Sequence, residues 1–560
     1  MALAAGVAIP LALLASPASA QVLRRDGTLY YPPGVEVSRA LTPIEREYLR
    51  RHPFQGGAAD AVTPPPSGPI HCAAEYEPME AIMVAWVGVH TGIIGQLGRW
   101  TTTTGNAEFH VMLNSAGSQS TANSTLVSAG ANMSRVRYFV PTASLNTVWI
   151  RDYGPRYIYE GGCRGIIDHK YNRPRPADDV LPDYYGLQRR HAFYQLGLNG
   201  NQLIHGGGNY HLDAVNRGYA TRLIVNENLG SPNFFTEPQV VSIWETYQGL
   251  QQTLFTPFPT SVDATQHLDM WMQVIADNKV VISDWPNNPG STQDQICDSA
   301  AVFMAGRGYT VYRIPAFSIG SHFTFTNMVM CNDVVMVPSY SHSTVSPHNA
   351  AVVATLQAAL PGKTIQQINC DSIIGQAGAI HCIVMHVPKH RGAPGAGGGL
   401  APTAFVKAPV GGGAVPAGAP YQVRWISDDD VLVTSVDVEY SLNGGATWVP
   451  LAMWAPDTGA YTWNTPAVHA NRARLRVTAW DAQGNAGSDE SGSFRLGNPC
   501  YANCDDSTTA PALNVADFSC FLTAYASGDG YANCDSSTTA PILNVADFSC
   551  FLQSYAGGCP

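Results

Sequence analysis

Short apolar runs recur along the middle of the chain, separated by turns and by stretches with helical spacing. Examples between residues 71 and 390 are AIMVAWVG, EFHVML, RVRYFVP, NKVVISDW, YTVYRIP and NDVVMVP. Several of these runs are apolar throughout, as expected for strands that are buried on both faces of a sheet. The pattern therefore predicts one large α/β domain over residues 71–390, built from repeated units of strand and helix.

The pattern changes after residue 390. Residues 391–420 are rich in Gly, Pro and Ala, a composition typical of a linker. Residues 421–497 then alternate apolar and polar positions in short runs such as YQVRW and ARLRVTAWD, with a hairpin signal at Asn443-Gly444. This alternation predicts an immunoglobulin-like β-sandwich.

The tail, residues 498–560, contains an internal repeat, in which YANCDDSTTAPALNVADFSCFL returns as YANCDSSTTAPILNVADFSCFL. Each copy places Asn, Asp and Ser oxygens ahead of an apolar helical run, and such hard oxygen ligands suit Ca²⁺. The candidate ligands are Asn503, Asp505, Ser507, Asn514 and Asp517, and in the second copy Asn533, Asp535, Ser537, Asn544 and Asp547. The repeat resembles a dockerin-like pair of half EF-hands, which implies calcium and a cohesin-like or cell-surface partner. A helical mini-domain held by disulfides is the alternative, because six of the twelve cysteines lie here and their pairing stays open.

The first residues carry a different signal. Residues 1–20 are apolar and end in Ala-Ser-Ala, as a secretory signal peptide does. Residues 21–70 are polar and contain prolines, which predicts a leader or pro-segment. We therefore expect a secreted, cell-surface or periplasmic protein with no membrane span in the mature chain, in a compartment where disulfides persist.

Charge narrows the choice of partners. The net charge of −11 and the absence of a Lys/Arg patch argue against nucleic acid. An acidic protein is compatible with a cationic substrate.

Polar residues that a core does not favour gather in four stretches of the α/β region. They are Asp152 in WIRDYGP, His267 and Asp269 in QHLDMW, Asn327 in FTNMVM and Cys382 in AIHCIV. Each alone has an ordinary explanation, such as a turn residue, a core histidine or a buried thiol. His267 and Asp269 alternate, so a strand would place both on one face, and we also expect a strand around Cys382.

Together these residues match the needs of one reaction. Two carboxylates can hold a guanidinium through charge-assisted hydrogen bonds. A thiolate can then attack the central carbon, and the positive charge of the substrate favours the ionised thiol. A histidine can protonate the departing ammonia and deprotonate water in the second half of the reaction. The set therefore predicts arginine deimination through a thiouronium intermediate.

Five separated motifs carry a family resemblance. AEYEPMEAIMVAW, WIRDYGP, GGGNYHLD, HLDMW and GAIHC, within residues 71–390, resemble the Porphyromonas-type peptidylarginine deiminase and agmatine deiminase family. The resemblance implies a five-bladed, pseudo-symmetric α/β propeller (the pentein fold) with the site in its central cavity, and catalysis without a cofactor. It implies these roles: Cys382 as nucleophile, His267 as general acid and base, Asp152 and Asp269 as guanidinium ligands, Asn327 as a polar lining residue and Trp149 as an aromatic wall.

Two arginines help to distinguish the peptidylarginine deiminases of this family from the agmatine deiminases. Arg173 and Arg175 lie one residue apart in YNRPRPADD, stiffened by prolines, and form a receptor for a carboxylate. A C-terminal arginine carries such a carboxylate and agmatine does not. The alternative is a surface loop with two solvated arginines. The family pattern also leads us to expect a tyrosine where this chain has Ala264.

The sequence thus predicts a secreted hydrolase that converts arginine, preferably at peptide C-termini, to citrulline and ammonia. Peptides or proteins with arginine are the expected substrates. One rival is a deiminase of agmatine or another small guanidine compound. A second rival is a surface-attached binding protein with an inactive domain.

Overall fold

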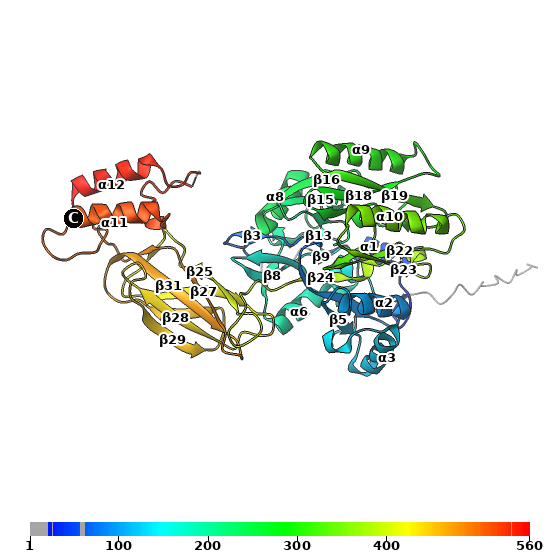
Figure 1. Ribbon diagram of the computed structural model, residues 1–560, viewed down its shortest axis with the longest axis horizontal. Coiled ribbons are helices and arrows are strands. Elements are labelled where there is room, and N and C mark those ends of the chain that lie inside the picture. The colour runs from blue at the N-terminus through cyan, green and yellow to red at the C-terminus, as the bar shows by residue number, and fades with distance from the viewer. Residues whose placement is uncertain (1–20, 25, 56–61, 539, 560) are drawn as a thin grey trace, which may run out of the picture.

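The structure, a computed structural model, describes residues 21–24, 26–55, 62–538 and 540–559. Figure 1 shows an α/β domain, a β domain beside it, and helices α11 (Val515–Ala526) and α12 (Val545–Gly557) at the far end. The predicted signal peptide, residues 1–20, lies outside the described residues. Within the described part of the chain, no helix has the length and apolar character that a membrane crossing requires.

Five sheets of three or four strands, counted over the described residues, build the α/β domain, and each repeats one unit. An antiparallel strand pair leads through a helix to a strand parallel to one member of the pair. The antiparallel pairs are β7 (Arg156–Glu160) with β8 (Cys163–Asp168), β14 (His211–Leu212) with β15 (Arg217–Thr221), β17 (Met272–Ala276) with β18 (Lys279–Asp284), β21 (Val329–Cys331) with β22 (Val334–Ser339), and β24 (Met385–Pro388) with β4 (Met79–Trp86). The parallel strands are β10 (Ala192–Gln195), β16 (Gln251–Phe255), β19 (Thr310–Ser318), β23 (Thr364–Asn369) and β5 (Glu108–Leu113).

Helices fill the crossovers between these strands: α6 (Leu181–Arg189), α8 (Glu237–Gln248), α9 (Thr292–Gly306), α10 (Asn349–Ala359) and α2 (Thr91–Thr102). Parallel strands need such a crossover, and the helices then cover the sheet, which explains the continuous apolar runs. The predicted α/β class and its repeated units are confirmed. The five-bladed propeller stays an interpretation.

The last strand of the domain closes onto its first large sheet. β24 pairs antiparallel with β4, with Met385 opposite Met83. Both strands are buried almost throughout. This closure brings the segment just before β24, which contains Cys382, next to the start of the domain.

The leader packs against the α/β domain and, within its described residues, contains one regular helix, α1 (Pro43–Arg51). Thr42 caps it, because its side chain accepts from the backbone N–H of Glu45 while the Glu45 carboxylate accepts from Thr42 N at 2.9 Å. Glu45 is buried, whereas Arg46, on the same helix, is exposed. The first turn of α1 therefore faces the domain.

The β domain has two sheets around one core. One contains β25 (Thr403–Ala408), β27 (Pro420–Asp428) and β30 (Ala460–Asn464); the other contains β26 (Ala414–Val415), β33 (Phe494–Leu496), β31 (Ala470–Trp480), β28 (Ser435–Ser441) and β29 (Val449–Ala455), with β32 (Ala486–Glu490) beside β31. The predicted linker over residues 391–420 is wrong in part, because β25 and β26 belong to these sheets. Ala404 and Val406 alternate into the core, a strand pattern that the Gly/Pro/Ala composition concealed.

A buried ion pair joins the two domains. Arg164 of β8 contacts Asp428 of β27 through two nitrogens, with Nε 2.9 Å from Oδ2 and Nη2 3.2 Å from Oδ1. His390 and His191 lie 3.0 Å and 3.3 Å from the same carboxylate. A buried carboxylate with these partners fixes the β domain against the α/β domain.

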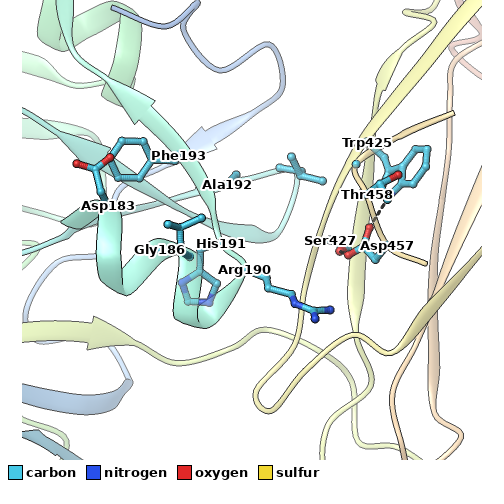
Figure 2. A pocket seen from close by; sticks show the side chains of 13 residues that line it. Asp183, Gly186, Arg190, His191, Ala192, Phe193, Trp425, Ser427, Asp457 and Thr458 are labelled. Atoms are coloured by element: carbon cyan, nitrogen blue, oxygen red, sulfur yellow. Dashed lines mark hydrogen bonds between the residues drawn. The ribbon is translucent and has the colours of Figure 1, made fainter. Parts of the chain in front are cut away.

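A cavity of about 640 Å³ lies beside this contact, between α6 and β27. Figure 2 shows Arg190 and Phe193 on one side and Trp425 and Asp457 on the other. Asp457 is held in place by Trp425 Nε1 at 2.8 Å. The residues predicted to react do not line this cavity.

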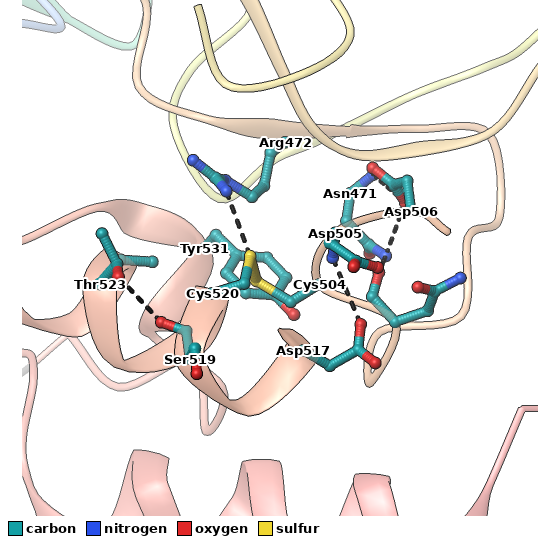
Figure 3. The surroundings of a disulfide bond; sticks show 12 residues. Asn471, Arg472, Cys504, Asp505, Asp506, Asp517, Ser519, Cys520, Thr523 and Tyr531 are labelled. Atoms are coloured by element: carbon teal, nitrogen blue, oxygen red, sulfur yellow. Dashed lines mark hydrogen bonds between the residues drawn. A yellow bond between two sulfur atoms is a disulfide. The ribbon is translucent and has the colours of Figure 1, made fainter. Parts of the chain in front are cut away.

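Three disulfides hold the tail: Cys500–Cys559, Cys504–Cys520 and Cys534–Cys550. The other six cysteines, Cys72, Cys163, Cys297, Cys331, Cys370 and Cys382, are free and buried. The tail also contacts the β domain, because Arg472 of β31 donates to Cys520 Sγ at 3.1 Å (Figure 3).

Four of the predicted calcium ligands cap the tail helices. Asn514 and Asp517 form a capping box at the start of α11, and Asn544 and Asp547 repeat it at α12. Asp505 N donates to Asp517 Oδ1 at 3.4 Å, so the loop ahead of α11 closes onto its cap (Figure 3). Calcium binding stays a prediction.

Candidate functional site: a buried thiol and two carboxylates around a guanidinium

Asp152 lies in the short helix α4 (Ile150–Tyr153), which follows directly after Trp149. Its side chain is buried. The backbone N–H of Gly208 donates to Asp152 Oδ1 at 3.1 Å, from a segment far along the chain. The carboxylate is thus fixed from two elements.

His267 and Asp269 are also buried, but they do not lie in a strand. His267 has an extended backbone and Asp269 lies in the turn η3 (Leu268–Met270), while β17 begins only at Met272. The predicted strand is therefore wrong at these positions. Both side chains still reach one centre, because His267 Nδ1 lies 3.4 Å from Asp152 Oδ1.

Cys382 lies in another short turn, η6 (His381–Ile383), just before β24. The predicted strand is wrong here too, because regular pairing with β4 starts at Met385. Asn327 holds the turn: its Oδ1 accepts from His381 N at 3.0 Å and its Nδ2 lies 3.2 Å from Cys382 Sγ. Turns of this kind can aim a side chain at a point that the pleat of a strand would not reach.

A guanidinium occupies the centre of this cluster, and it belongs to Arg39 of the leader. Asp152 binds it through two oxygens, with Nη2–Oδ1 at 2.7 Å and Nε–Oδ2 at 2.9 Å. Asp269 accepts from Nη1 and Nη2, each at 3.1 Å. Cys382 Sγ lies 2.6 Å from Nη1 and His267 Nδ1 lies 2.8 Å from Nη2. The Arg39 side chain is fully buried.

The charges of this centre support one another. Burial alone would raise the pKa of Asp152, but the Arg39 guanidinium and His267 hold that pKa well below its ordinary value. Burial also favours a raised pKa for Asp269, but the Arg39 guanidinium holds this pKa below its ordinary value. For Cys382, burial raises the pKa well above its ordinary value, and the Arg39 guanidinium opposes this effect. A cation at the centre therefore favours the ionised forms of Asp152, Asp269 and Cys382.

A further layer of polar residues supports the centre. The ring of His381 bridges two carboxylates, with Nδ1 2.9 Å from Asp269 Oδ2 and Nε2 3.0 Å from Glu75 Oε2. Arg151 binds Glu75 at 2.7 Å. Burial favours a raised pKa for Glu75, but Arg151 and His381 hold the pKa well below its ordinary value. These residues orient Asp269.

Sequence reasoning missed this layer. Glu75 and His381 both stand inside the motifs quoted above, so the motifs themselves were the available signal. Among the described residues, Glu75, His211 and His381 are the one group that brings three potential metal ligands within 4.8 Å. Both ring nitrogens of His381 already contact carboxylates, so the group fits an ion-paired histidine and not a metal centre.

Two glycines make room for the side chains that meet in the site. A Cβ on Gly208 would overlap Nη2 of Arg39 and would lie 2.7 Å from Asp269 Oδ2. A Cβ on Gly378 would lie 2.7 Å from the ring of Trp149 and 3.0 Å from Cys382 Sγ. The GGG motif, which as a sequence signals a turn, thus forms one wall of the pocket.

Side chains of the α/β domain also bind the main chain of the leader. Trp149 Nε1 donates to the carbonyl of Val37 at 2.7 Å. Arg175 Nη2 donates to the carbonyl of Ser38 at 2.6 Å, and Arg173 Nε donates to that of Arg39 at 3.2 Å. Three successive carbonyls are therefore each bound by a different side chain.

Arg173 and Arg175 are buried, so the alternative of two solvated arginines on a surface loop is wrong. The carboxylate that Arg175 binds here is that of Glu45, with Nε–Oε1 at 2.8 Å. The predicted catalytic and substrate-binding residues thus meet in one place, whereas the predicted calcium ligands lie in the tail, apart from it.

A mixed α/β domain in which a buried cysteine, a histidine and two aspartates surround a guanidinium defines a hydrolase that acts on the C–N bonds of guanidino groups. The model of one family, Porphyromonas-type peptidyl-arginine deiminase, matches residues 71–388. The chain belongs to this family.

The chain is also similar to curated proteins and to solved structures. A protein of Vibrio parahaemolyticus named "Putative agmatine deiminase" is 22% identical over 289 residues, which cover 43% of this chain and 76% of the relative. A solved structure under the same name is 14% identical with a TM-score of 0.50, over 57% of this chain and 96% of its own, and shows the same fold. A solved arginine deiminase, named as "putative", from Porphyromonas gingivalis is 17% identical over 57% of this chain and 99% of its own, with a TM-score of 0.46.

Proposed function

We propose that this protein is a secreted protein-arginine deiminase, which hydrolyses the guanidinium of peptide-bound arginine to citrulline and ammonia. One observation carries the proposal. An arginine side chain, that of Arg39, lies between two carboxylates with the Cys382 sulfur 2.6 Å from one of its nitrogens. The cluster therefore accepts the group on which the reaction acts.

In the first half-reaction, the Cys382 sulfur adds to the central carbon of the guanidinium and one terminal nitrogen leaves. Asp152 and Asp269 hold the cation and keep the plane of the guanidinium fixed. The pKa of Cys382 is raised by burial and lowered by a neighbouring guanidinium, so binding of the substrate itself promotes the thiolate. His267, against the terminal nitrogen, delivers the proton that the leaving ammonia needs.

In the second half-reaction, water attacks the thiouronium carbon and the C–S bond breaks. His267 is the base that takes the proton of this water. Citrulline and the free thiol result. The proposed steps use side chains of this chain alone and call for no cofactor.

The substrate is proposed to be a peptide because the main chain of the leader is bound at Val37, Ser38 and Arg39. Arg173 contacts the carbonyl oxygen of Arg39, the atom that becomes a carboxylate oxygen when arginine is C-terminal. A full negative charge there strengthens the bond to Arg173. C-terminal arginine is accordingly the proposed preferred substrate, with arginine inside a chain also accepted.

Export is supported by the tail, since three disulfides persist only in an oxidising compartment. The repeats of the tail are proposed to attach the enzyme to a cohesin-like or cell-surface partner. Agmatine is the second candidate substrate, because curated relatives bear the name agmatine deiminase.

Ammonia release from four substrates tests the proposal: a peptide ending in arginine, one with internal arginine, free arginine and agmatine. The full chain would carry Arg39→Ala and Glu45→Ala, which remove the leader's side chains from the site. We expect turnover in the order of C-terminal, then internal arginine, then agmatine, and none after Cys382→Ser is added. Preference for agmatine would favour the second candidate. No turnover of any of them would instead favour the surface-attached binding role.

A further inference from the structure

The leader enters the site as a substrate would, with Arg39 at the reacting position. We propose that Cys382 deiminates Arg39 of its own chain, so that Arg39 is a site of self-modification and the leader is the first substrate of the enzyme. This inference rests on the proposed function. It adds a particular acceptor residue and a step that precedes turnover of any other peptide.

The contacts of Arg39 differ from those of a structural arginine. Arg164 and Arg175 are also fully buried, and their described partners are oxygens of carboxylates, carbonyls and a tyrosine. Arg39 alone of the three contacts a sulfur and a histidine nitrogen as well. A cation that needed only neutralisation would be satisfied by its two carboxylates.

The backbone holds Arg39 in place for reaction. Its N–H donates to the carbonyl of Gln376 at 3.0 Å, and its carbonyl accepts from Arg173. On either side, the leader is fixed by Trp149 at Val37 and by Arg175 at Glu45. Such a fixed segment presents its guanidinium at a high effective concentration, because no association step precedes the reaction.

The chemistry balances within the chain and water. The Cys382 sulfur forms a bond to Cζ of Arg39, and the Cζ–Nη2 bond breaks. The proton of the thiol ends on the departing nitrogen, which His267 faces, and ammonia leaves. Water then adds to Cζ, the C–S bond breaks, and citrulline, the thiol and one proton remain. No oxidant, reductant or co-reactant enters.

The product no longer fits the site. Citrulline is neutral, so Asp152 and Asp269 lose the cation that balances two buried carboxylates. The leader then leaves the pocket and frees it for other arginines. Self-deimination would thus convert a closed enzyme into an open one.

Peptide mapping by mass spectrometry of the purified full chain tests this directly. We expect citrulline at position 39 in most wild-type molecules and arginine at position 46, which lies in the same leader but in solvent. The variant Cys382→Ser, produced in the same way, should keep arginine at position 39. Mixing it with the active Arg39→Ala/Glu45→Ala variant should leave it unmodified, because its leader stays docked in its own site.

The outcomes separate this inference from the proposed function. Intact Arg39 in wild-type protein, together with turnover of peptides by Arg39→Ala/Glu45→Ala, would overturn self-deimination and leave the deiminase function standing. Citrulline at position 39 in Cys382→Ser would also overturn it, since another enzyme would then be responsible. The surface pair Arg46→Ala/Glu47→Ala is the matched control and should be converted at position 39 as the wild type is.

Discussion

The guanidinium of Arg175 and the carboxylate of Glu45 form a fully buried ion pair, with Nε 2.8 Å from Oε1. Burial favours a raised pKa for Glu45, but Arg175 lowers it, so the carboxylate stays ionised. This pair joins helix α1 of the leader to the loop that carries Arg173. It is the anchor of the leader.

The first prediction concerns this anchor. Glu45→Gln keeps the size of the side chain and removes its charge, which leaves Arg175 buried and unpaired at a cost of roughly 3–5 kcal/mol. In the Cys382→Ser background, in which Arg39 keeps its guanidinium and the leader stays docked, we expect Glu45→Gln to accelerate limited proteolysis of the leader by on the order of a hundredfold or more, since cleavage requires undocking. Glu47→Gln is the control, because Glu47 is exposed and pairs with Arg50 and Arg51 at the surface. Equal cleavage rates in both variants would contradict the anchor.

The second prediction separates peptide substrates from agmatine. In the Arg39→Ala/Glu45→Ala background, Arg173→Ala should reduce kcat/KM for a C-terminal arginine by roughly ten- to a hundredfold, the worth of one charge-assisted hydrogen bond. The kcat/KM for agmatine, which has no carboxylate, should fall little in the same variant. Steady-state kinetics on both substrates measures the difference. An equal loss on both would mean that Arg173 supports the fold and does not recognise the carboxylate.

The third prediction tests the wall of the pocket. Gly208→Ala places a methyl group where the guanidinium lies, between Asp152 and Asp269. A displacement of a reacting group by about 1 Å lowers the rate by on the order of a hundredfold. In the Arg39→Ala/Glu45→Ala background we therefore expect Gly208→Ala to lower kcat/KM at least that much. Gly306→Ala at the end of α9, where the added Cβ meets nothing within 4 Å, should leave the rate unchanged. Full activity of the Gly208 variant would place the guanidinium elsewhere.

The fourth prediction is a pH dependence of stability. Burial lowers the pKa of four histidines to about 4: His169, His191, His322 and His386. Their ordinary pKa is about 6.5, so the unfolded chain binds more protons than the folded chain between these values. The stabilising contribution of these four histidines should therefore be full above about pH 6.5 and fall as the pH falls toward 4.

Calorimetry of the full chain at a series of pH values checks this expectation through Tm. His322→Gln removes one of the four groups and should make the slope of Tm against pH shallower. A Tm that is constant or rises as the pH falls from 6.5 to 5 would show that these histidines do not control acid stability.

The fifth prediction concerns calcium in the tail. Asn503, Asp505 and Ser507 with Asp517, and the equivalent residues of the second repeat, should bind Ca²⁺, with oxygen ligands replacing part of the local hydrogen bonding. Titration calorimetry on the full chain should detect this binding, and Asp505→Asn with Asp535→Asn should weaken it. If no heat of binding is detected at millimolar Ca²⁺, the calcium prediction is wrong, and the disulfides alone stabilise the tail.

Much of the α/β domain follows from local sequence. Strands buried on both faces must be apolar, which is why residues 81–86 of β4 and the strand β22 stand out as runs without charge. The convergence of Cys382, His267, Asp152 and Asp269 was also predictable, because a thiol, a histidine and two carboxylates in apolar surroundings have few structural uses. β25 escaped prediction because its two core positions, Ala404 and Val406, are embedded in a Gly/Pro/Ala-rich stretch.

Sequence alone determined which residues we predict to carry the chemistry of this protein: Cys382, His267, Asp152 and Asp269. Tertiary structure alone decided what lies between them. Arg39 and Cys382 are 343 residues apart, and no local pattern distinguishes Arg39 from Arg46, seven positions further along the leader. The difference arises only when two distant carboxylates converge, because a buried charge requires partners in space and not in sequence.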